Sequence, residues 1–221
     1  MTILCIETST SVCSAAICKD GEPLKQCISL EGGNHAKLLP SYIEELLDYA
    51  RQKALTIDAV ALSEGPGSYT GLRIGTSTAK GLCYGLNIPL IPVPTLEVLK
   101  EASGLKEGCL VPMIDARRME VYTTDENGKA RAVVVENEKS LSSDSEAVFY
   151  YFGDGAAKCQ TVLTQPNWHY LPGIVPQAQY MGVLANSQSP ITNAKSRDLA
   201  YYEPYYLKEF IAAPSHVKGL V

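Results

Sequence analysis

The order of the apolar runs in the first hundred residues constrains the fold more than any other feature of this sequence. Three strand-like runs come first, Thr2–Thr8, Val12–Cys18 and Pro23–Leu30, and an Asp-Gly dipeptide within Lys19–Gly21 separates the last two. Because this dipeptide is preferred in tight hairpins, the three runs predict an antiparallel meander.

A strand, a helix and a second strand are predicted after the meander. A helical stripe of apolar residues indicates a first helix that begins near Asn34. The strand Ile57–Leu62, the helix Thr70–Gly85 and the strand Ile88–Val93 then follow in order. Such a unit forms a right-handed crossover between parallel strands, so we expect an α/β fold with a mixed sheet.

The second half of the chain is expected to form a smaller lobe. A helix at Thr95–Ala102 closes the first lobe, and the polar, glycine-containing stretch Ser103–Gly108 places the boundary between residues 1–102 and 103–221. The elements predicted in the second lobe are the strands Leu110–Ile114, Glu120–Thr124 and Ala130–Val135, which form a second meander, and the helix Ala178–Ala185.

Composition excludes several classes of protein. Among 221 residues, 46% are hydrophobic and 19% are charged, which is typical of a globular chain and not of a disordered one. The net charge of −5 leaves no overall positive field for nucleic acid, so any contact with nucleic acid is expected to be local or delegated to a partner. The odd number of cysteines, seven, without a CxxC pair, and a first segment without a basic leader predict a cytoplasmic protein with no membrane association.

The glycine-rich segment Ser63–Gly75, SEGPGSYTGLRIG, allows two interpretations. Backbone amides at a helix start favour anions, so a weak ATP or ADP site is one of them. The spacing matches no phosphate-binding fingerprint, however, and no lysine follows the loop as a P-loop requires. The residues that such a nucleotide site would use are Glu7, Gly65, Gly67 and Ser68.

The other interpretation of these glycines is close packing of helices. Each glycine inside a helix costs about 1 kcal/mol relative to alanine, and close approach of another helix would offset that cost. We therefore expect the first two helices to pack against the same helices of a partner, which in isolation is a second copy. On this hypothesis a Gly75→Leu change breaks the assembly and leaves the monomer folded. The predicted interface residues are Ile43, Leu46, Leu47, Gly71, Gly75, Thr78 and Leu82.

No catalytic or metal-binding constellation is expected. The three histidines lie far apart in the sequence, and no serine or cysteine lies in a recognisable nucleophile motif. His35, at a helix start, is expected to have a structural role. Glu7 could either hold a hydrated cation or cap a turn. Arg117 and Arg118 form a basic spot that is more typical of a solvated hairpin shoulder.

Six segments carry a resemblance to a known family. In chain order they are ILCIETSTSVCSAAI, NHAKLLP, GPGSYTGLRIG, IPVPTLEVL, MIDARRMEVY and PYYLK. Together they resemble the TsaB family, the non-catalytic paralogue of TsaD in bacterial threonylcarbamoyladenosine modification of tRNA. The family is also described as glycoprotease-like or YeaZ-type.

The resemblance implies both a fold and a set of partners. The fold is the two-lobe actin- and hexokinase-like (ASKHA) fold, α/β in class, with a mixed sheet and helices in each lobe. The implied function is that of a non-catalytic scaffold that binds and activates the TsaD threonylcarbamoyltransferase. A TsaE-type ATPase would join through the complex, and the chain alone would form a homodimer.

The same resemblance bears on catalysis. TsaD carries a metal-binding HxxxH pair, and the corresponding positions here are Thr95 and Leu99, neither of which supplies the required ligand. The chain is therefore expected to lack an active site, a metal and a tightly bound cofactor of its own. Two alternatives stay open, a small-molecule kinase of the same superfamily and a glycoprotease-like peptidase.

Overall fold

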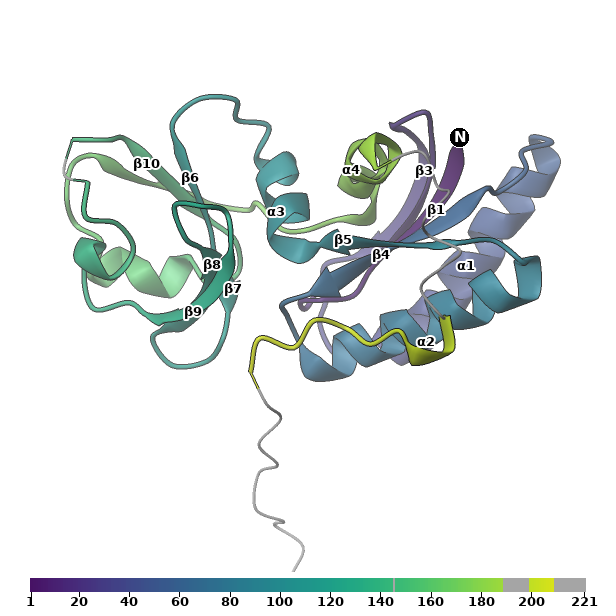
Figure 1. The fold of residues 1–221 in the computed structure, drawn as a ribbon, viewed down its shortest axis with the longest axis horizontal. Helices are drawn as coiled ribbons and strands as arrows, with labels where there is room; N and C mark the ends of the chain where they lie inside the picture. The colour runs from purple at the N-terminus through teal and green to yellow at the C-terminus, as the bar shows by residue number, and fades with distance from the viewer. Residues whose placement is uncertain (145, 189–198, 209–221) are drawn as a thin grey trace, which may run out of the picture.

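In the computed structural model, which describes residues 1–144, 146–188 and 199–208, the chain forms two lobes that lie side by side (Figure 1). The α/β class and the two-lobe arrangement expected from the sequence are confirmed. Within the described residues, no helix combines the length and the apolar character that a membrane crossing requires.

The first lobe is built on a five-stranded sheet in the order β3-β2-β1-β4-β5. The predicted meander is antiparallel, and β1, β4 and β5 are parallel, so the sheet is mixed as expected. Asp20 and Gly21 both have positive φ, 52° and 94°, in the predicted tight turn. The strands of this sheet are β1 (Thr2–Glu7), β2 (Cys13–Lys19), β3 (Glu22–Ser29), β4 (Ala59–Gly65) and β5 (Leu90–Pro94).

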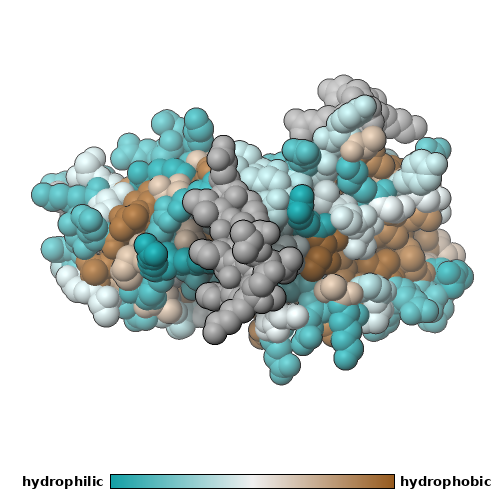
Figure 2. All heavy atoms as spheres, turned by 90° about the horizontal axis from the view of Figure 1, so that it is seen from below, coloured by the Kyte–Doolittle hydropathy of each residue, from teal (hydrophilic) through white to brown (hydrophobic). Residues whose placement is uncertain are grey.

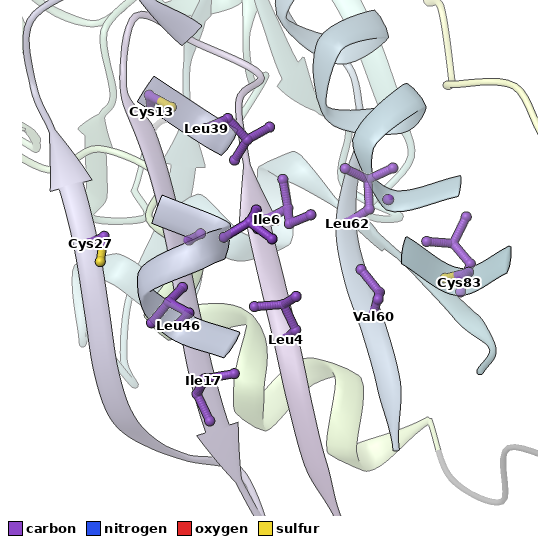
Figure 3. Close-up of a cluster of buried hydrophobic side chains, with 14 residues drawn as sticks. Leu4, Ile6, Cys13, Ile17, Cys27, Leu39, Leu46, Val60, Leu62 and Cys83 are labelled. Atoms are coloured by element: carbon purple, nitrogen blue, oxygen red, sulfur yellow. The ribbon is translucent and has the colours of Figure 1, made fainter. Parts of the chain in front are cut away.

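Helices cover both faces of this sheet. α1 (His35–Gln52) and α2 (Tyr69–Leu86) lie together on one face, and the apolar side chains of the sheet and helices meet between the layers (Figures 1 and 3). The short helices η3 (Ala178–Tyr180) and α4 (Met181–Ser187) pack against the other face. The labelled residues of the first core are Leu4, Ile6, Cys13, Ile17, Cys27, Leu39, Leu46, Val60, Leu62 and Cys83.

Helix α4 returns to the first lobe, which differs from the predicted contiguous second lobe of residues 103–221. Met181 and Ala185 of α4 are fully buried in one cluster with Ile3 and Cys5 of β1. Without α4 this sheet face would leave apolar side chains in water, although α3 also contributes Val98 to the same cluster. Burial of that face therefore determines where α4 lies.

The second lobe contains two three-stranded sheets. The predicted meander is confirmed only in part: β8 and β9 pair antiparallel, but just the end of its predicted first strand, Leu110–Ile114, joins them as β7. The rest of that strand is β6, which pairs in parallel with β10, and β10 pairs in parallel with β11. Sequence patterns did not predict β10 and β11, two short aromatic runs. The strands are β6 (Cys109–Pro112), β7 (Ile114–Asp115), β8 (Glu120–Thr124), β9 (Ala130–Val134), β10 (Phe149–Phe152) and β11 (Trp168–Leu171).

A buried cluster joins the two lobes. Leu96 and Leu99 come from α3 (Thr95–Ser103), which follows β5, and they pack against Ile114 and Phe152 of the second lobe. All four side chains are at most 2% exposed. The helix at the lobe boundary is therefore shared between the two hydrophobic cores.

Candidate functional site

A buried carboxylate lies where β1 ends. The pairing of Ile6 with Leu62 places Glu7 at the level of Ser63, at the carboxyl edge of two parallel strands. Ligands of open α/β sheets bind at this edge. Glu7 is fully buried, and its Oε1 accepts hydrogen bonds from the amide of Ser9, at 2.6 Å, and from the Ser9 hydroxyl. Its Oε2 has no hydrogen-bond partner within the described residues.

This environment changes the acidity of Glu7. Loss of solvent raises the pKa of its carboxyl to about 7, and the hydrogen bonds from Ser9, with the nearby Ser63 hydroxyl, only partly counteract the shift. The charge of Asp154, in the second lobe, adds a smaller upward contribution to the same pKa. Sequence patterns did not indicate Asp154, because only the folding of the two lobes brings it near Glu7.

The glycine-rich loop is packed against its own chain. The amide of Gly65 donates to Thr95 Oγ1 at 3.1 Å, and the amide of Ser68 donates to the Ser9 carbonyl at 2.6 Å. A Cβ on Gly67 would lie 2.3 Å from that same carbonyl oxygen, so only glycine fits there. These two amides are occupied, which leaves them no free hydrogen for a phosphate. The nucleotide site at Glu7, Gly65, Gly67 and Ser68 stays a prediction.

Gly71 and Gly75 of α2 also face the first lobe itself. A Cβ on Gly71 would lie 2.0 Å from the Thr8 carbonyl oxygen, and one on Gly75 would lie 2.4 Å from Thr8 Oγ1. The Thr8 hydroxyl donates to the Gly71 carbonyl at 2.8 Å, which ties β1 to the helix. The prediction that a partner helix occupies the space beside Gly71 and Gly75 is wrong, because Thr8 fills it.

Two of the predicted interface residues on α1 belong to the core. Leu46 is fully buried and Ile43 is 7% exposed, since both point at the sheet. Neither presents much surface to a partner. Leu47, Thr78 and Leu82 are only half-buried and retain exposed surface on the helices. Sequence periodicity marked the apolar stripe correctly but could not separate its core side from its outer margin.

A groove runs between α1 and α2. Its volume is about 550 Å³, and Ile43, Leu47 and Thr78 lie at its apolar part. Figure 2, which views the molecule from the side of α2, shows apolar surface on the half that carries the first lobe. The residues that complete the lining are Pro40, Glu44, Asp48 and Arg51. The two helices, which were predicted to lie side by side, thus form a concave surface between them.

Thr95 and Leu99, where metal-ligand side chains are lacking, have packing roles. Thr95 is fully buried and accepts the Gly65 hydrogen bond, and Leu99 lies in the cluster between the lobes. The ring Nε2 of His35 lies 3.1 Å from the Val12 carbonyl oxygen, which fits the structural role expected for it. In the described part of the chain, no group of three or more His, Cys, Asp or Glu side chains could hold a metal ion.

The two arginines after β7 form an exposed turn. Arg117 and Arg118 have positive φ angles, 71° and 49°, which is unusual for residues other than glycine. Beside them, Lys158 pairs with Asp115 and donates to the Glu120 carbonyl at 2.7 Å. The surroundings are those of a solvated hairpin shoulder.

Three comparisons place the chain among known proteins. The sequence family TsaD, described as tRNA N6-adenosine threonylcarbamoyltransferase, matches residues 30–145. The TsaB protein of Escherichia coli, named a tRNA threonylcarbamoyladenosine biosynthesis protein, is 36% identical over 134 residues, 58% of each chain. The TsaB protein of Bacillus subtilis is 34% identical over 123 residues, 56% of this chain and 54% of that one.

A solved structure extends the likeness to nearly the whole fold. YeaZ from Pseudomonas aeruginosa superimposes with a TM-score of 0.72 at 25% identity, over 93% of this chain and 99% of that one. The chain spans about half the length of the curated relatives it matches. Since the family match covers more than half of the residues, the chain belongs to the TsaD sequence family and, within it, to the TsaB group.

Proposed function

We propose that this protein is a non-catalytic scaffold subunit in the biosynthesis of threonylcarbamoyladenosine in tRNA. It binds and activates a TsaD-type catalytic paralogue, and a TsaE-type ATPase and the tRNA are reached through that complex. In the absence of the paralogue, a second copy of the chain takes its place. The seven cysteines, none of them in a disulfide, support a cytoplasmic location.

The observation that carries this proposal is the groove between α1 and α2. It offers an apolar strip, formed mainly by Leu47 and Thr78 beside the largely buried Ile43, on a pair of helices that already pack firmly on their own sheet. A related fold would present a similar helix pair, and a two-fold contact between such pairs is self-complementary. The groove thus fits a helical partner better than a small polar substrate.

The charges around the groove give the proposed contact its specificity. Glu44, Asp48 and Arg51 surround the apolar strip, and Arg51 donates to Asp48 at 2.6 Å. Exposed pairs of this kind contribute little to stability, so they remain available to a partner of matching charge. Charges on the rim of an interface mainly set partner choice and association rate.

A Thr78→Phe variant is expected to weaken binding of the TsaD-type paralogue by tenfold or more. The ring would fill the groove, and overpacking of a close contact typically costs about 1–3 kcal/mol. Binding is measured by calorimetry or sedimentation, with circular dichroism to show that the variant is folded. Ser77→Phe is the matched control, because Ser77 is exposed, precedes Thr78 on α2 and does not line the groove. Equal loss of binding in both variants would contradict the proposed surface.

The isolated chain is expected to hydrolyse neither ATP nor peptides. The two loop amides that a phosphate would use are bonded to Thr95 and Ser9, and Thr95 and Leu99 supply no metal-binding pair. ATP turnover and peptide cleavage are assayed with contaminant-free protein, alone and with added divalent metal. Sustained ATP turnover would favour the kinase alternative, and cleavage would favour the peptidase.

A further inference from the structure

A segment near the end of the chain lies across the first lobe and reaches the second. It comprises Leu199–Lys208, begins with the short helix η5 (Leu199–Tyr201), and runs along α2 in Figure 1, where it is yellow. We call these ten residues the clasp.

The first attachment of the clasp is to the side of α2. Lys80 Nζ donates to two of its carbonyl oxygens, that of Ala200 at 2.7 Å and that of Tyr202 at 3.2 Å. Leu199 and Tyr202 pack partly against the first core. One lysine therefore satisfies two clasp carbonyls, and hydrogen bonds from a charged donor are stronger than neutral ones.

The second attachment closes the carboxyl edge of β4. The Tyr205 amide donates to the Glu64 carbonyl at 2.7 Å, and a Cβ on Gly65 would lie 2.4 Å from the Tyr205 carbonyl oxygen. The backbone of the clasp thus packs directly against the backbone of β4 at its carboxyl end. The Tyr206 ring then packs 4.8 Å from that of Tyr69 at the start of α2.

The outer end of the clasp is held more weakly. Lys208 pairs with Glu120 of β8 in the second lobe, and the two side chains are 43% and 21% exposed. Exposed ion pairs contribute little to stability. Tyr201 and Tyr205 also face solvent, so the apolar contacts of the segment are those of Leu199, Tyr202 and Tyr206. Segments with these properties open locally, without global unfolding.

We propose that the clasp is a gate over the carboxyl edge of β1 and β4, which closes this edge in the free protein and opens while the first lobe stays folded. Glu7 lies at that edge, where β1 ends, fully buried and with one carboxylate oxygen unpartnered within the described residues. Opening gives water, or a ligand that donates hydrogen bonds, access to this oxygen. The gate is a property of the isolated chain and does not depend on the proposed partner.

Hydrogen exchange followed by mass spectrometry tests the gate on the full chain. Amides of Leu199–Lys208 are expected to exchange far faster than those of β1 and β4, and Lys80→Met should accelerate them about tenfold further. Lys37→Met, which removes an exposed lysine on α1, should change nothing. Lys208→Glu, which places like charge beside Glu120 on the surface, gives a second variant that retains the packed contacts.

Carboxyl labelling with a carbodiimide and an amine tests whether opening reaches Glu7. Labelling of Glu7 should be slow in the wild type and several-fold faster in Lys80→Met or Lys208→Glu, while exposed Asp48 reacts equally in all of them. If the amides of the clasp exchange no faster than those of β1 and β4, the clasp is a fixed part of the lobe. Faster clasp exchange without faster labelling of Glu7 would show that it gates nothing.

Discussion

Replacing Gly75 with alanine is expected to destabilise the folded monomer by about 2–4 kcal/mol, although alanine is the better helix former. The new Cβ would lie 2.4 Å from Thr8 Oγ1 and 3.1 Å from Leu62 Cδ1. Thr8 must then move, which strains a well-packed contact and breaks its hydrogen bond to the Gly71 carbonyl. Denaturant unfolding followed by circular dichroism measures the loss.

Gly81→Ala on the same helix is the matched control for this prediction. A Cβ at Gly81 meets nothing within 4 Å, so only helix propensity acts there and stability should rise by up to about 1 kcal/mol. Gly75→Leu should unfold the chain, whereas the interface hypothesis predicts that it disrupts only the assembly. A stable Gly75→Ala monomer with weakened self-association would restore the interface interpretation of this glycine.

Replacing Glu7 with glutamine is expected to stabilise the protein by about 3 kcal/mol at pH 8 and to change little at pH 4.5. Burial raises the pKa of the folded carboxyl to about 7, from 4.5 as the ordinary value. The folded state therefore binds more protons between these pH values, and stability is lost as pH rises through that window. Glutamine keeps an acceptor for Ser9 and cannot ionise.

The measurement is the free energy of unfolding at several pH values between 4.5 and 8, compared between the variant and the wild type. The difference isolates Glu7 from the other carboxylates, some of which act in the opposite direction. Glu31→Gln, at an exposed position after β3, is the control and should follow the wild type throughout. Parallel curves for Glu7→Gln and the wild type would show that Glu7 does not titrate in this range.

The sequence predicted the first lobe well because its signals are local. The Asp-Gly turn at residues 20 and 21, the apolar run of β1 and the helical stripe on α1 each depend on neighbours in the chain. The parallel pairing of β10 with β6 depends on contacts between distant segments. Its four residues, Phe149–Phe152, are too short for periodicity to separate a strand from a helix.

The candidate site was predicted only in part for the same reason. Glycines in Ser63–Gly75 were correctly taken as points of close approach, but the element approached was assigned to a partner instead of to Thr8 and Ser9. A helical stripe reports that a face is buried and does not say what buries it. Apart from its PYYLK segment, the clasp left no signal of its position, because its contacts with Lys80 and Glu64 join segments far apart in sequence.

Reconstitution of tRNA modification tests the central claim most directly. Threonylcarbamoyladenosine is quantified in tRNA incubated with the TsaD-type paralogue of the same organism, with this chain, and with both, using wild type, Thr78→Phe and Ser77→Phe. We predict product only when both proteins are present, strong loss of product with Thr78→Phe, and normal product with Ser77→Phe. Product from this chain alone, or full activity with a Thr78→Phe chain that still binds the paralogue, would contradict a scaffold acting through the α1–α2 groove.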